Sequence, residues 1–392
     1  MKITVKTFYG LEEVLKEELE ELGFSEIKLL NRAVQLEGEW KDVYFLNLHL
    51  RCALAILVEL AHFQINDEKD ILKKAKLIQW DSFFDVNKTI AVKGAIFSKL
   101  FNNTHYPFLL VKDAICDYFI EKTGNRPDVA VKNPQVLIDL YVNNRDVSIS
   151  INTSGAPLYQ RGYRIETGKA PINEVLAAGM IRLSKWDKKS TFIDPFCGSG
   201  TILIEAALLA ADIPSQIERQ HYAFKNFKSY DENLWESIYN QVKKRITSFP
   251  CRIIGSDINA EMIFACKRNM RALPISKWVE LSNKSFDEYI QVNWENATLM
   301  SNPPYGERMQ FNEDNHSILD LYQQIGSWFK HELSSVSCWL ISSNFEALQQ
   351  IGLKPSKKYT LFNGDLECSF RNYVIYQGSK KEKLSDVTFS QK

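Results

Sequence analysis

The stretch Thr-Phe-Ile-Asp-Pro-Phe-Cys-Gly-Ser-Gly-Thr, residues 191–201, decides the fold of the carboxyl-terminal half of the chain. Residues 191–193 are typical of a buried strand, and Gly198 and Gly200 predict a tight turn from which a helix starts. Strand and helix patterns then alternate from residue 252 to residue 341. Such alternation predicts a parallel sheet covered by helices on both faces, which is an α/β fold.

The glycine turn lets a ligand approach the backbone closely, and three kinds of nucleotide site compete for it. A P-loop would need a lysine after its last glycine, but Thr201 follows Gly200, which disfavours ATP hydrolysis. A dinucleotide fingerprint would need a third glycine where Leu203 stands, and leucine there would obstruct close packing of helix on strand. The remaining interpretation of this Rossmann-like half is an adenosine ligand without a pyrophosphate.

Acidic residues stand at the predicted ends of three successive strands: Asp194, Asp257 and Asp287. In open α/β sheets, ligands bind outside these strand ends. We interpret Asp194 as facing the ligand's ammonium group, Asp257 its ribose hydroxyls and Asp287 its adenine amino group. Each residue alone is more often a helix cap or a surface charge, and Asp257 before Asn259 fits a cap. Three of them, with Asn302 at the fourth strand end, are hard to obtain from capping alone.

Residues 299–306, Leu-Met-Ser-Asn-Pro-Pro-Tyr-Gly, contain the end of that fourth strand and the stiff loop after it, because proline cannot continue a strand. The Asn302 side-chain oxygen and the Pro303 carbonyl are two acceptors, which suit the two hydrogens of a planar amino group. Pro304 stiffens the loop, and the ring of Tyr305 can stack on the ring that carries the amine. Accepting both hydrogens makes such a nitrogen electron-rich and aims its lone pair at an electrophile. The alternative is a purely structural role, in which the loop is a Pro-Pro turn and the tyrosine packs against its neighbours.

The amino-terminal half has the strand and helix patterns of an α+β fold and ends in a junction rich in glycine and proline. The predicted organisation is a first unit at 1–55, a second at 56–155, a linker and first helix of the next domain at 156–189, the α/β domain at 190–378, and a flexible tail at 379–392.

An insertion at 212–250 interrupts the α/β domain, because a simple unit would place Asp257 only roughly 20 residues after the glycine turn. It carries five aromatic residues: Tyr222, Phe224, Phe227, Tyr230 and Trp235. These either help to enclose a substrate or pack on the helices of the sheet.

Charge and cysteine content exclude several classes of protein. Lys plus Arg and Asp plus Glu each number 48 among 392 residues, so nucleic-acid contact must come from local patches rather than a global field. The seven cysteines include no CxxC pair and fit reduced core thiols of a cytoplasmic protein. The six histidines lack metal-ligand spacing, so we expect no metal. No stretch has the length and apolar character of a secretion signal or a membrane span.

Residues 194–201 and 302–305 resemble the first motif and the amino-group motif of class I S-adenosylmethionine-dependent methyltransferases. Residues 107–136, with Lys112-Asp113-Ala114 and Arg126-Pro127, resemble a THUMP domain, an RNA-binding module, and the preceding residues resemble its ferredoxin-like companion. The whole arrangement is similar to the THUMP-containing guanine-N2 methyltransferases, above all to the amino-terminal half of the bifunctional large-subunit ribosomal RNA enzymes. The second methyltransferase half of those enzymes is not expected in this chain.

This resemblance implies an enzyme, expected as a monomer, that binds S-adenosylmethionine and methylates the exocyclic N2 of a guanosine in large-subunit ribosomal RNA. Transfer RNA, adenine N6 in nucleic acid, and a non-enzymatic role in ribosome assembly are the alternatives. The implied catalytic residues are Asn302, Pro303, Pro304 and Tyr305. The implied cofactor-binding residues are Asp194, Pro195, Cys197, Gly198, Ser199, Gly200, Thr201, Asp257, Ile258, Asp287 and Asn302. The implied RNA-binding residues are Lys112, Arg126, Arg164 and Arg308.

Overall fold

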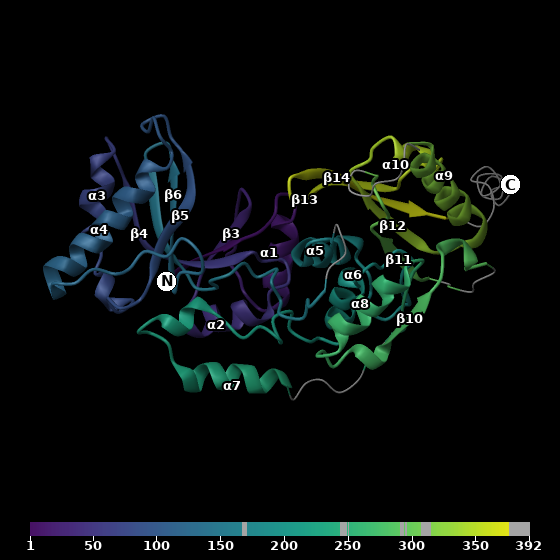
Figure 1. The fold of residues 1–392 in the computed structure, drawn as a ribbon, viewed down its shortest axis with the longest axis horizontal. Coiled ribbons are helices and arrows are strands. Elements are labelled where there is room, and N and C mark those ends of the chain that lie inside the picture. Colours follow the sequence, from purple (N-terminus) through teal and green to yellow (C-terminus); the bar gives the residue numbers. More distant parts are fainter. Residues whose placement is uncertain are drawn as a thin grey trace, which may run out of the picture. The chain divides into compact units, whose positions relative to one another are not determined.

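The computed structural model describes residues 1–166, 171–243, 249, 251–290, 294, 296–306 and 315–375 (Figure 1). The chain forms two compact units. Unit 1 consists of Met1–Gln160 and Arg219–Lys244, and unit 2 consists of Arg161–Glu218 and Arg245–Lys392. The polypeptide therefore passes from one unit to the other three times. In the described part of the chain, no helix has the length and apolar character that a membrane span requires.

Unit 1 is built on a single seven-stranded sheet with the order β2-β3-β1-β4-β7-β6-β5. Antiparallel pairing of β1 with β4, from Ile3–Val58 to Lys6–Ala55, joins the two predicted amino-terminal units into this one sheet. Its elements are β1 (Lys2–Lys6), α1 (Glu12–Glu21), β2 (Lys28–Leu30), β3 (Ala33–Glu37), α2 (Trp40–His49), β4 (Ala55–Gln64), α3 (Lys69–Ala75), η1 (Trp80–Ser82), β5 (Ile90–Phe97), α4 (Tyr106–Thr123), β6 (Val136–Asn143) and β7 (Asp146–Asn152).

The two faces of this sheet differ because its strands alternate apolar and polar residues. Ile3 and Val5 of β1 are buried, and their cross-strand neighbours are buried apolar residues too. On the opposite face, the Lys2 ammonium pairs with Glu59 at 2.7 Å, and Lys6 pairs with Asp139. The apolar face forms the core of unit 1.

The inserted segment from Arg219 onward belongs to unit 1, not to the sheet that it interrupts. Its elements are η2 (Ala223–Asn226) and α7 (Glu232–Lys243), and α7 lies beside α2 (Figure 1). The ring of Tyr44 on α2 meets Phe224 and Trp235 at centroid distances of 4.7 and 6.4 Å. The Arg219 guanidinium donates to the carbonyls of Pro157 and Gln160 at 3.0 Å. The expectation that these five aromatic residues pack on the helices of the α/β sheet is therefore wrong, because they belong to unit 1.

Unit 2 contains a second seven-stranded sheet with the order β10-β9-β8-β11-β12-β14-β13. The first five strands run parallel, and β14 is antiparallel to both β12 and β13. The elements are α5 (Glu174–Ser184), β8 (Phe192–Asp194), α6 (Thr201–Ala210), β9 (Ile253–Asp257), α8 (Ala260–Met270), η3 (Ser276–Trp278), β10 (Val279–Asn283), η4 (Phe286–Glu288), β11 (Thr298–Ser301), α9 (Asn315–Glu332), β12 (Ser337–Ser342), α10 (Ala347–Gln350), β13 (Lys357–Asn363) and β14 (Leu366–Val374). The predicted Rossmann-like α/β fold is confirmed.

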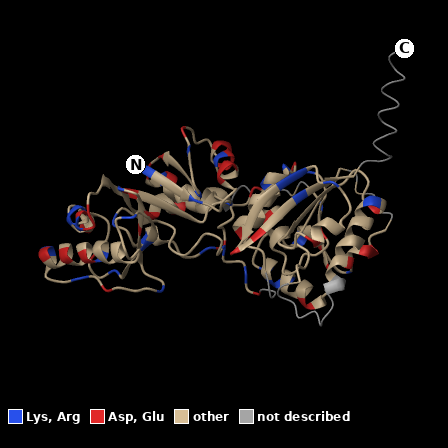
Figure 2. Cartoon of the chain, turned by 90° about the horizontal axis from the view of Figure 1, so that it is seen from above, with Lys and Arg blue, Asp and Glu red and all other residues tan. Residues whose placement is uncertain are grey.

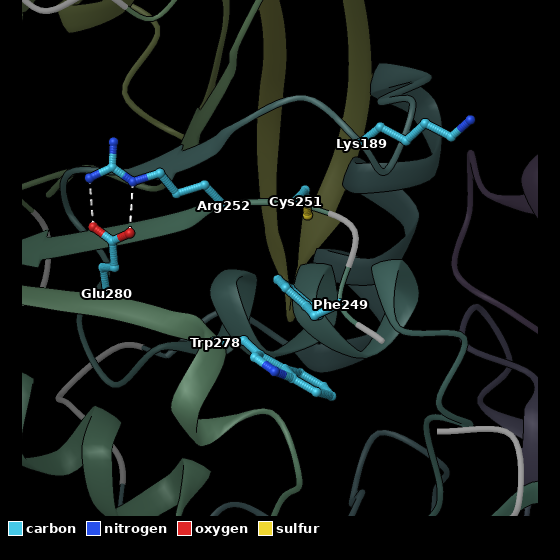
Figure 3. Close-up of a pocket in the computed structure, with 6 residues that line it drawn as sticks. All are labelled: Lys189, Phe249, Cys251, Arg252, Trp278 and Glu280. Carbon is cyan, nitrogen blue, oxygen red and sulfur yellow. Dashed lines mark hydrogen bonds and ion pairs between the residues drawn. The ribbon is translucent and has the colours of Figure 1, made fainter. Parts of the chain in front are cut away.

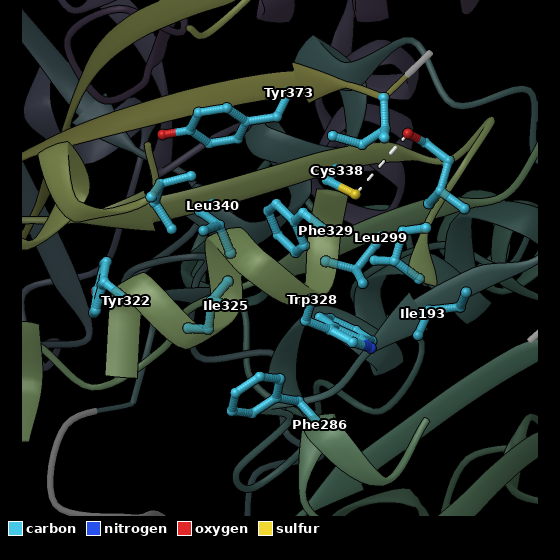
Figure 4. Packing of buried hydrophobic residues seen from close by; sticks show 14 of the residues in the cluster. Ile193, Phe286, Leu299, Tyr322, Ile325, Trp328, Phe329, Cys338, Leu340 and Tyr373 are labelled. Carbon is cyan, nitrogen blue, oxygen red and sulfur yellow. Dashed lines mark hydrogen bonds between the residues drawn. The ribbon is translucent and has the colours of Figure 1, made fainter. Parts of the chain in front are cut away.

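One part of the core of unit 2 lies between α9 and the strands β11, β12 and β14. Figure 4 shows Trp328 and Phe329 of α9 among Leu299, Cys338 and Tyr373. All five are nearly or completely buried. This cluster fixes β11, the strand that ends at the predicted amine-binding loop.

The close helix–strand contact of this sheet is made in a way that the sequence did not predict. A Cβ atom on Gly255 of β9 would lie 2.2 Å from the Leu203 side chain of α6. The missing side chain is therefore on the strand, and Leu203 fills the space that it leaves. Leucine at 203 therefore does not obstruct the packing of helix on strand, contrary to the expectation from the sequence. Its presence still distinguishes this turn from a dinucleotide fingerprint.

Candidate active site

The predicted ligand residues lie at the carboxyl ends of neighbouring strands. Asp257 ends β9, Asp194 ends β8, and Asn302 follows Ser301, the last residue of β11. These strands are adjacent in the sheet, and the strand order reverses between β8 and β11. Such a switch point is where an open α/β sheet leaves a crevice for ligands.

Asp194 is the most buried of the three predicted carboxylates, with 1% of its surface exposed. One of its oxygens accepts hydrogen bonds from the Phe196 amide at 3.1 Å and from the Ser301 hydroxyl. Burial raises the pKa of Asp194 to about 7, and the two hydrogen bonds oppose that rise. Asp194 can therefore change its charge near neutral pH.

The turn from Pro195 to Gly200 depends on its two glycines for different reasons. Both have positive φ angles, +52° at Gly198 and +89° at Gly200. A Cβ on Gly200 would lie 2.3 Å from the Cys266 sulfur, whereas a Cβ on Gly198 would meet no atom within 4 Å. Gly200 is thus needed for packing, and Gly198 leaves the backbone open to a ligand.

Neighbouring residues hold the rest of this turn. The Cys197 amide donates to Ser256 O at 2.9 Å, and Cys197 itself is buried. The Asn269 side chain donates to Ser199 O at 3.0 Å and accepts from the amides of Ile165 and Glu166 at 2.8 and 2.9 Å. Asn269 was not predicted, because an asparagine within a helix pattern gives no signal of such a contact.

Asp257 supports the glycine turn. Its two oxygens accept from the Gly198 amide at 3.0 Å and the Asn259 amide at 2.8 Å. Burial raises the pKa of Asp257, and these hydrogen bonds oppose the rise. Each carboxylate oxygen has a second lone pair, so both can still accept from a ligand. Asn259 is the cap of α8, so the simple capping alternative for Asp257 does not hold.

Ile258 follows Asp257 and is 77% exposed, which is unusual for a large apolar side chain. Asn283 of β10 holds this position by donating to the carbonyls of Asp257 and Ile258 at 2.8 and 2.9 Å. An exposed isoleucine held at a strand end offers an apolar surface to a flat ring. Asn283 is a second residue that the sequence did not predict.

Asp287 is exposed in η4, after β10. Its neighbour Phe286 packs on Phe196 of the glycine turn, with ring centroids 5.2 Å apart. This ring pair brings the segment of Asp287 next to the segment of Asp194.

The loop after β11 is short and internally bonded. The Tyr305 hydroxyl donates to the Asn302 side-chain oxygen, which keeps one lone pair for a further donor. Gly306 has a φ angle of +90°, so the chain turns sharply there. The structure places Asp194, Asp257 and Asn302 at the ends of neighbouring strands, and Asp287 in a segment that packs on the glycine turn through Phe286.

Arg164 lies inside unit 2 rather than on an RNA-facing surface. Its guanidinium pairs with Glu174 at 2.7 Å and donates to Ile172 O at 3.0 Å and to the Thr201 hydroxyl at 2.9 Å. Because Thr201 is the first residue of α6, this side chain ties the glycine turn to α5. The expected RNA contact of Arg164 does not fit this geometry.

Three further residues were predicted to contact RNA. Lys112 on α4 pairs with its neighbour Asp113 at 2.6 Å, and Arg126 is exposed after the end of α4. Arg308 lies outside the described residues. Figure 2 shows basic and acidic residues interspersed over the elements of both units, in keeping with their equal numbers.

A hollow of about 540 Å³ lies at the opposite ends of the strands (Figure 3). Arg252 and Glu280, joined by two hydrogen bonds of 2.7 Å, line it together with Phe249 and Trp278. It contains none of the strand-end carboxylates. In the described residues, no group of three or more His, Cys, Asp or Glu side chains is placed to hold a metal ion.

Comparison with known families agrees with this geometry. The family of RMKL-like methyltransferase domains matches residues 161–372, which is more than half of the chain. The chain belongs to this family. The amino-terminal part of this RMKL-like methyltransferase matches two further domains, the RlmL ferredoxin-like domain at residues 2–57 and the THUMP domain at residues 66–152.

Two curated relatives are named ribosomal RNA large subunit methyltransferase K/L. The protein of Shewanella frigidimarina (strain NCIMB 400) is 35% identical over 384 residues, and that of Marinomonas sp. (strain MWYL1) is 31% identical over 383 residues. Each alignment covers 96% of this chain and 53% of the relative. The chain thus spans about half the length of the curated relatives that it matches.

Solved structures share the fold over nearly the whole chain. A possible methylase from Clostridium difficile 630 has a TM-score of 0.86 at 27% identity and covers 97% of this chain and 99% of its own. A predicted N6-adenine-specific DNA methylase from Listeria monocytogenes str. 4b F2365 has a TM-score of 0.84 at 26% identity, with 96% of both chains covered. A methyltransferase complexed with SAH, the cofactor product S-adenosylhomocysteine, has a TM-score of 0.84 at 26% identity and covers 96% of this chain and 99% of its own.

Proposed function

We propose that this protein transfers a methyl group from S-adenosylmethionine to the exocyclic N2 of a guanosine in large-subunit ribosomal RNA. The family and the names of the curated relatives support this proposal, and the THUMP domain supports an RNA substrate. The observation that carries it is the hydrogen bond from Ser301 to Asp194, because it joins a cofactor-site carboxylate to the residue directly before the amine-binding Asn302.

The residues around the glycine turn fit S-adenosylmethionine. Asp194 would face the ammonium group, Asp257 the ribose hydroxyls, and Ile258 and Asp287 the adenine ring. The open space beside Gly198 leaves room for a ligand against the backbone. When bound, the cofactor supplies an electrophilic methyl group on a positively charged sulfur.

The loop after β11 would orient the nitrogen that reacts. The Asn302 side-chain oxygen and the Pro303 carbonyl accept its two hydrogens, and the ring of Tyr305 stacks on the base. As the nitrogen accepted the methyl group that the cofactor would supply, it would become acidic and would lose one proton to water, so positioning suffices without a strong base.

A base within a helix cannot reach a loop at a strand end, so the guanosine must be unpaired or flipped out. Shape recognition by the amino-terminal unit suits a chain without net charge better than base readout would. Such a substrate would be met in the cytoplasm, a compartment that agrees with seven free thiols.

Adenine N6 is the second candidate, because the loop suits any planar amine and the Listeria relative is described as a predicted adenine-specific DNA methylase. The RNA-type amino-terminal domains favour RNA. Transfer RNA is the alternative substrate nearest to the proposed one. The non-enzymatic alternative is an RNA-binding factor in ribosome assembly.

The test is product identification. Purified protein is incubated with isotopically labelled S-adenosylmethionine and, in parallel, with protein-free ribosomal RNA, transfer RNA or adenine-containing DNA, and nucleosides are analysed by mass spectrometry. We expect labelled N2-methylguanosine from ribosomal RNA. Labelled N6-methyladenosine from RNA, labelled N6-methyl-2′-deoxyadenosine from DNA, or label in transfer RNA alone would replace the proposed substrate. Tight cofactor binding without label in any substrate would overturn the enzymatic role.

A further inference from the structure

Three consecutive backbone carbonyls follow Asn302, and two of them accept hydrogen bonds from side chains of the described residues. The Tyr322 hydroxyl is 3.2 Å from Pro304 O, and the Asn344 side-chain amide donates to Tyr305 O at 3.2 Å. Within the described residues, no donor is bonded to Pro303 O, the carbonyl assigned above to the substrate amine.

The Tyr322 hydroxyl faces two acceptors. It lies 2.8 Å from the Ser342 hydroxyl oxygen and 3.2 Å from Pro304 O, so its one hydrogen is shared between them. Ser342 also accepts from the Asn344 amide at 3.1 Å, which fixes its place beside Tyr322. Burial raises the pKa of Tyr322, which keeps that hydrogen in place at neutral pH.

The residues that hold the loop are themselves well fixed. Tyr322 lies on α9 within the buried cluster of Figure 4, and both Tyr322 and Ser342 are fully buried. Asn344 is anchored because its oxygen accepts from the Ala347 amide at 2.8 Å. The strand β12, which ends at Ser342, pairs with all four residues of β11 through Ser337 to Leu340.

We propose that Tyr322 and Asn344 are positioning residues for methyl transfer. By holding the carbonyls of Pro304 and Tyr305, they orient the stiff loop so that the preceding carbonyl, Pro303 O, faces the substrate amine. This inference rests on the proposed function. It adds two residues that touch neither cofactor nor substrate.

Two conservative substitutions remove the hydrogen bonds while keeping their surroundings. Tyr322→Phe keeps the ring in the core, and Asn344→Asp keeps the oxygen that accepts from Ala347 but loses the donor to Tyr305 O. Tyr373→Phe is the matched control, because Tyr373 is buried in the same cluster and makes no hydrogen bond to the loop among the described residues. We would measure the single-turnover rate on RNA, the dissociation constant for SAH, and hydrogen exchange of the loop peptide 301–306.

In each loop variant we expect the single-turnover rate to fall about 3- to 10-fold, as the loss of one hydrogen bond predicts. The dissociation constant for SAH should stay within about twofold of the wild-type value. The amides of Tyr305 and Gly306 should exchange faster, and Tyr373→Phe should change none of the three.

The inference would be overturned if Tyr322→Phe and Asn344→Asp had the same single-turnover rate and the same hydrogen exchange of the loop as Tyr373→Phe. The proposed function would remain intact. Parallel losses of rate, of cofactor affinity and of melting temperature, the last measured by thermal unfolding, would replace it with a purely structural role. If the wild-type protein methylates no RNA or DNA, the proposed function fails. In that case, unchanged hydrogen exchange of the loop amides in Tyr322→Phe and Asn344→Asp would also reject the positioning role. Faster exchange would show only that the two residues hold the loop.

Discussion

The Ser301 hydroxyl donates a hydrogen bond to the Asp194 carboxyl across the β8–β11 pair, 107 residues apart in the sequence. Both residues are almost fully buried. A hydroxyl that donates to a buried carboxyl stabilises its charged form. The end of the strand that carries the predicted amine-binding loop therefore favours the charged form of the carboxylate predicted to meet the cofactor, against the larger effect of burial on its pKa.

Replacing Ser301 by alanine should weaken cofactor binding. The hydrogen bond to a charged group is worth about 1.5–3 kcal/mol, so we expect the SAH dissociation constant to rise on the order of tenfold at pH 7. Ser301→Thr keeps the hydroxyl and should bind nearly normally. Isothermal titration calorimetry measures both, and an unchanged constant in Ser301→Ala would contradict the role given to this bond.

Asp194 should make stability and cofactor binding depend on pH near neutrality. Its pKa is about 7 in the folded protein against an ordinary value of 3.8, so between these values only the folded state holds the proton. The free energy of unfolding of the wild type, measured relative to Asp194→Asn, should fall as the pH rises from about 4 to about 7 and then level off.

Cofactor binding should show the opposite trend, because an ammonium group prefers the carboxylate. Affinity for SAH should rise from pH 6 to pH 8 in the wild type and change less in Asp194→Asn. Calorimetry in buffers of different ionisation enthalpy should detect proton release on binding. No proton release near pH 6.5 would exclude Asp194 as the titrating group.

Asn302→Ala should separate chemistry from cofactor binding. Losing an acceptor for the amine should lower the methylation rate on the order of 100-fold, by analogy with the removal of a transition-state donor. Binding of SAH should remain, because the other implied cofactor residues lie around the glycine turn and after β9 and β10. Asn302→Asp keeps an acceptor oxygen and should retain more activity than alanine. Loss of SAH binding in a folded Asn302→Ala protein would refute this division.

Arg164→Ala should destabilise unit 2. The guanidinium is largely buried and pairs with Glu174, so its removal leaves a buried carboxylate unpaired and should cost about 3 kcal/mol. Arg268→Ala is the control, because its pair with Glu166 is exposed and should be worth less than about 1 kcal/mol. Chemical denaturation measures both. Equal losses in the free energy of unfolding of the two variants would show that the buried ion pair of Arg164 does not stabilise unit 2.

Arg126→Ala should weaken RNA binding without changing stability. Removing one exposed phosphate contact should lower the slope of log affinity against log salt by about 1. Lys28→Ala, an exposed charge on β2 of the same unit, is the control for simple loss of charge. A salt slope that falls equally in both variants would argue against a specific contact at Arg126.

The strand-end residues could be predicted from the sequence because their chemistry is local. A glycine turn after a short apolar run, or two prolines after Asn302, indicates its own backbone geometry. The parallel sheet then brings the strand ends together without further information. For these reasons the α/β fold and the place of Asp194, Asp257 and Asn302 followed from short stretches of sequence.

The supporting residues could not be predicted, because their partners are distant in the chain. Ser301, Asn269 and Tyr322 are ordinary residues in ordinary patterns, and only the folded sheet shows which atoms they bond. Arg164 was misjudged for the same reason: an arginine in a polar junction looks exposed until its carboxylate partner is known. Leu203 was misjudged because Gly255, which leaves room for its side chain, lies on β9, far along the sequence from α6.

The threading of the chain limits how the protein can be divided. A recombinant fragment that starts at Arg161 would still carry the segment beginning at Arg219, but not the α2 residue Tyr44 on which Phe224 and Trp235 pack. Those rings would then face water, and the fragment would tend to aggregate. Joining residue 218 to residue 245 through a short glycine–serine linker is therefore the rational way to isolate unit 2.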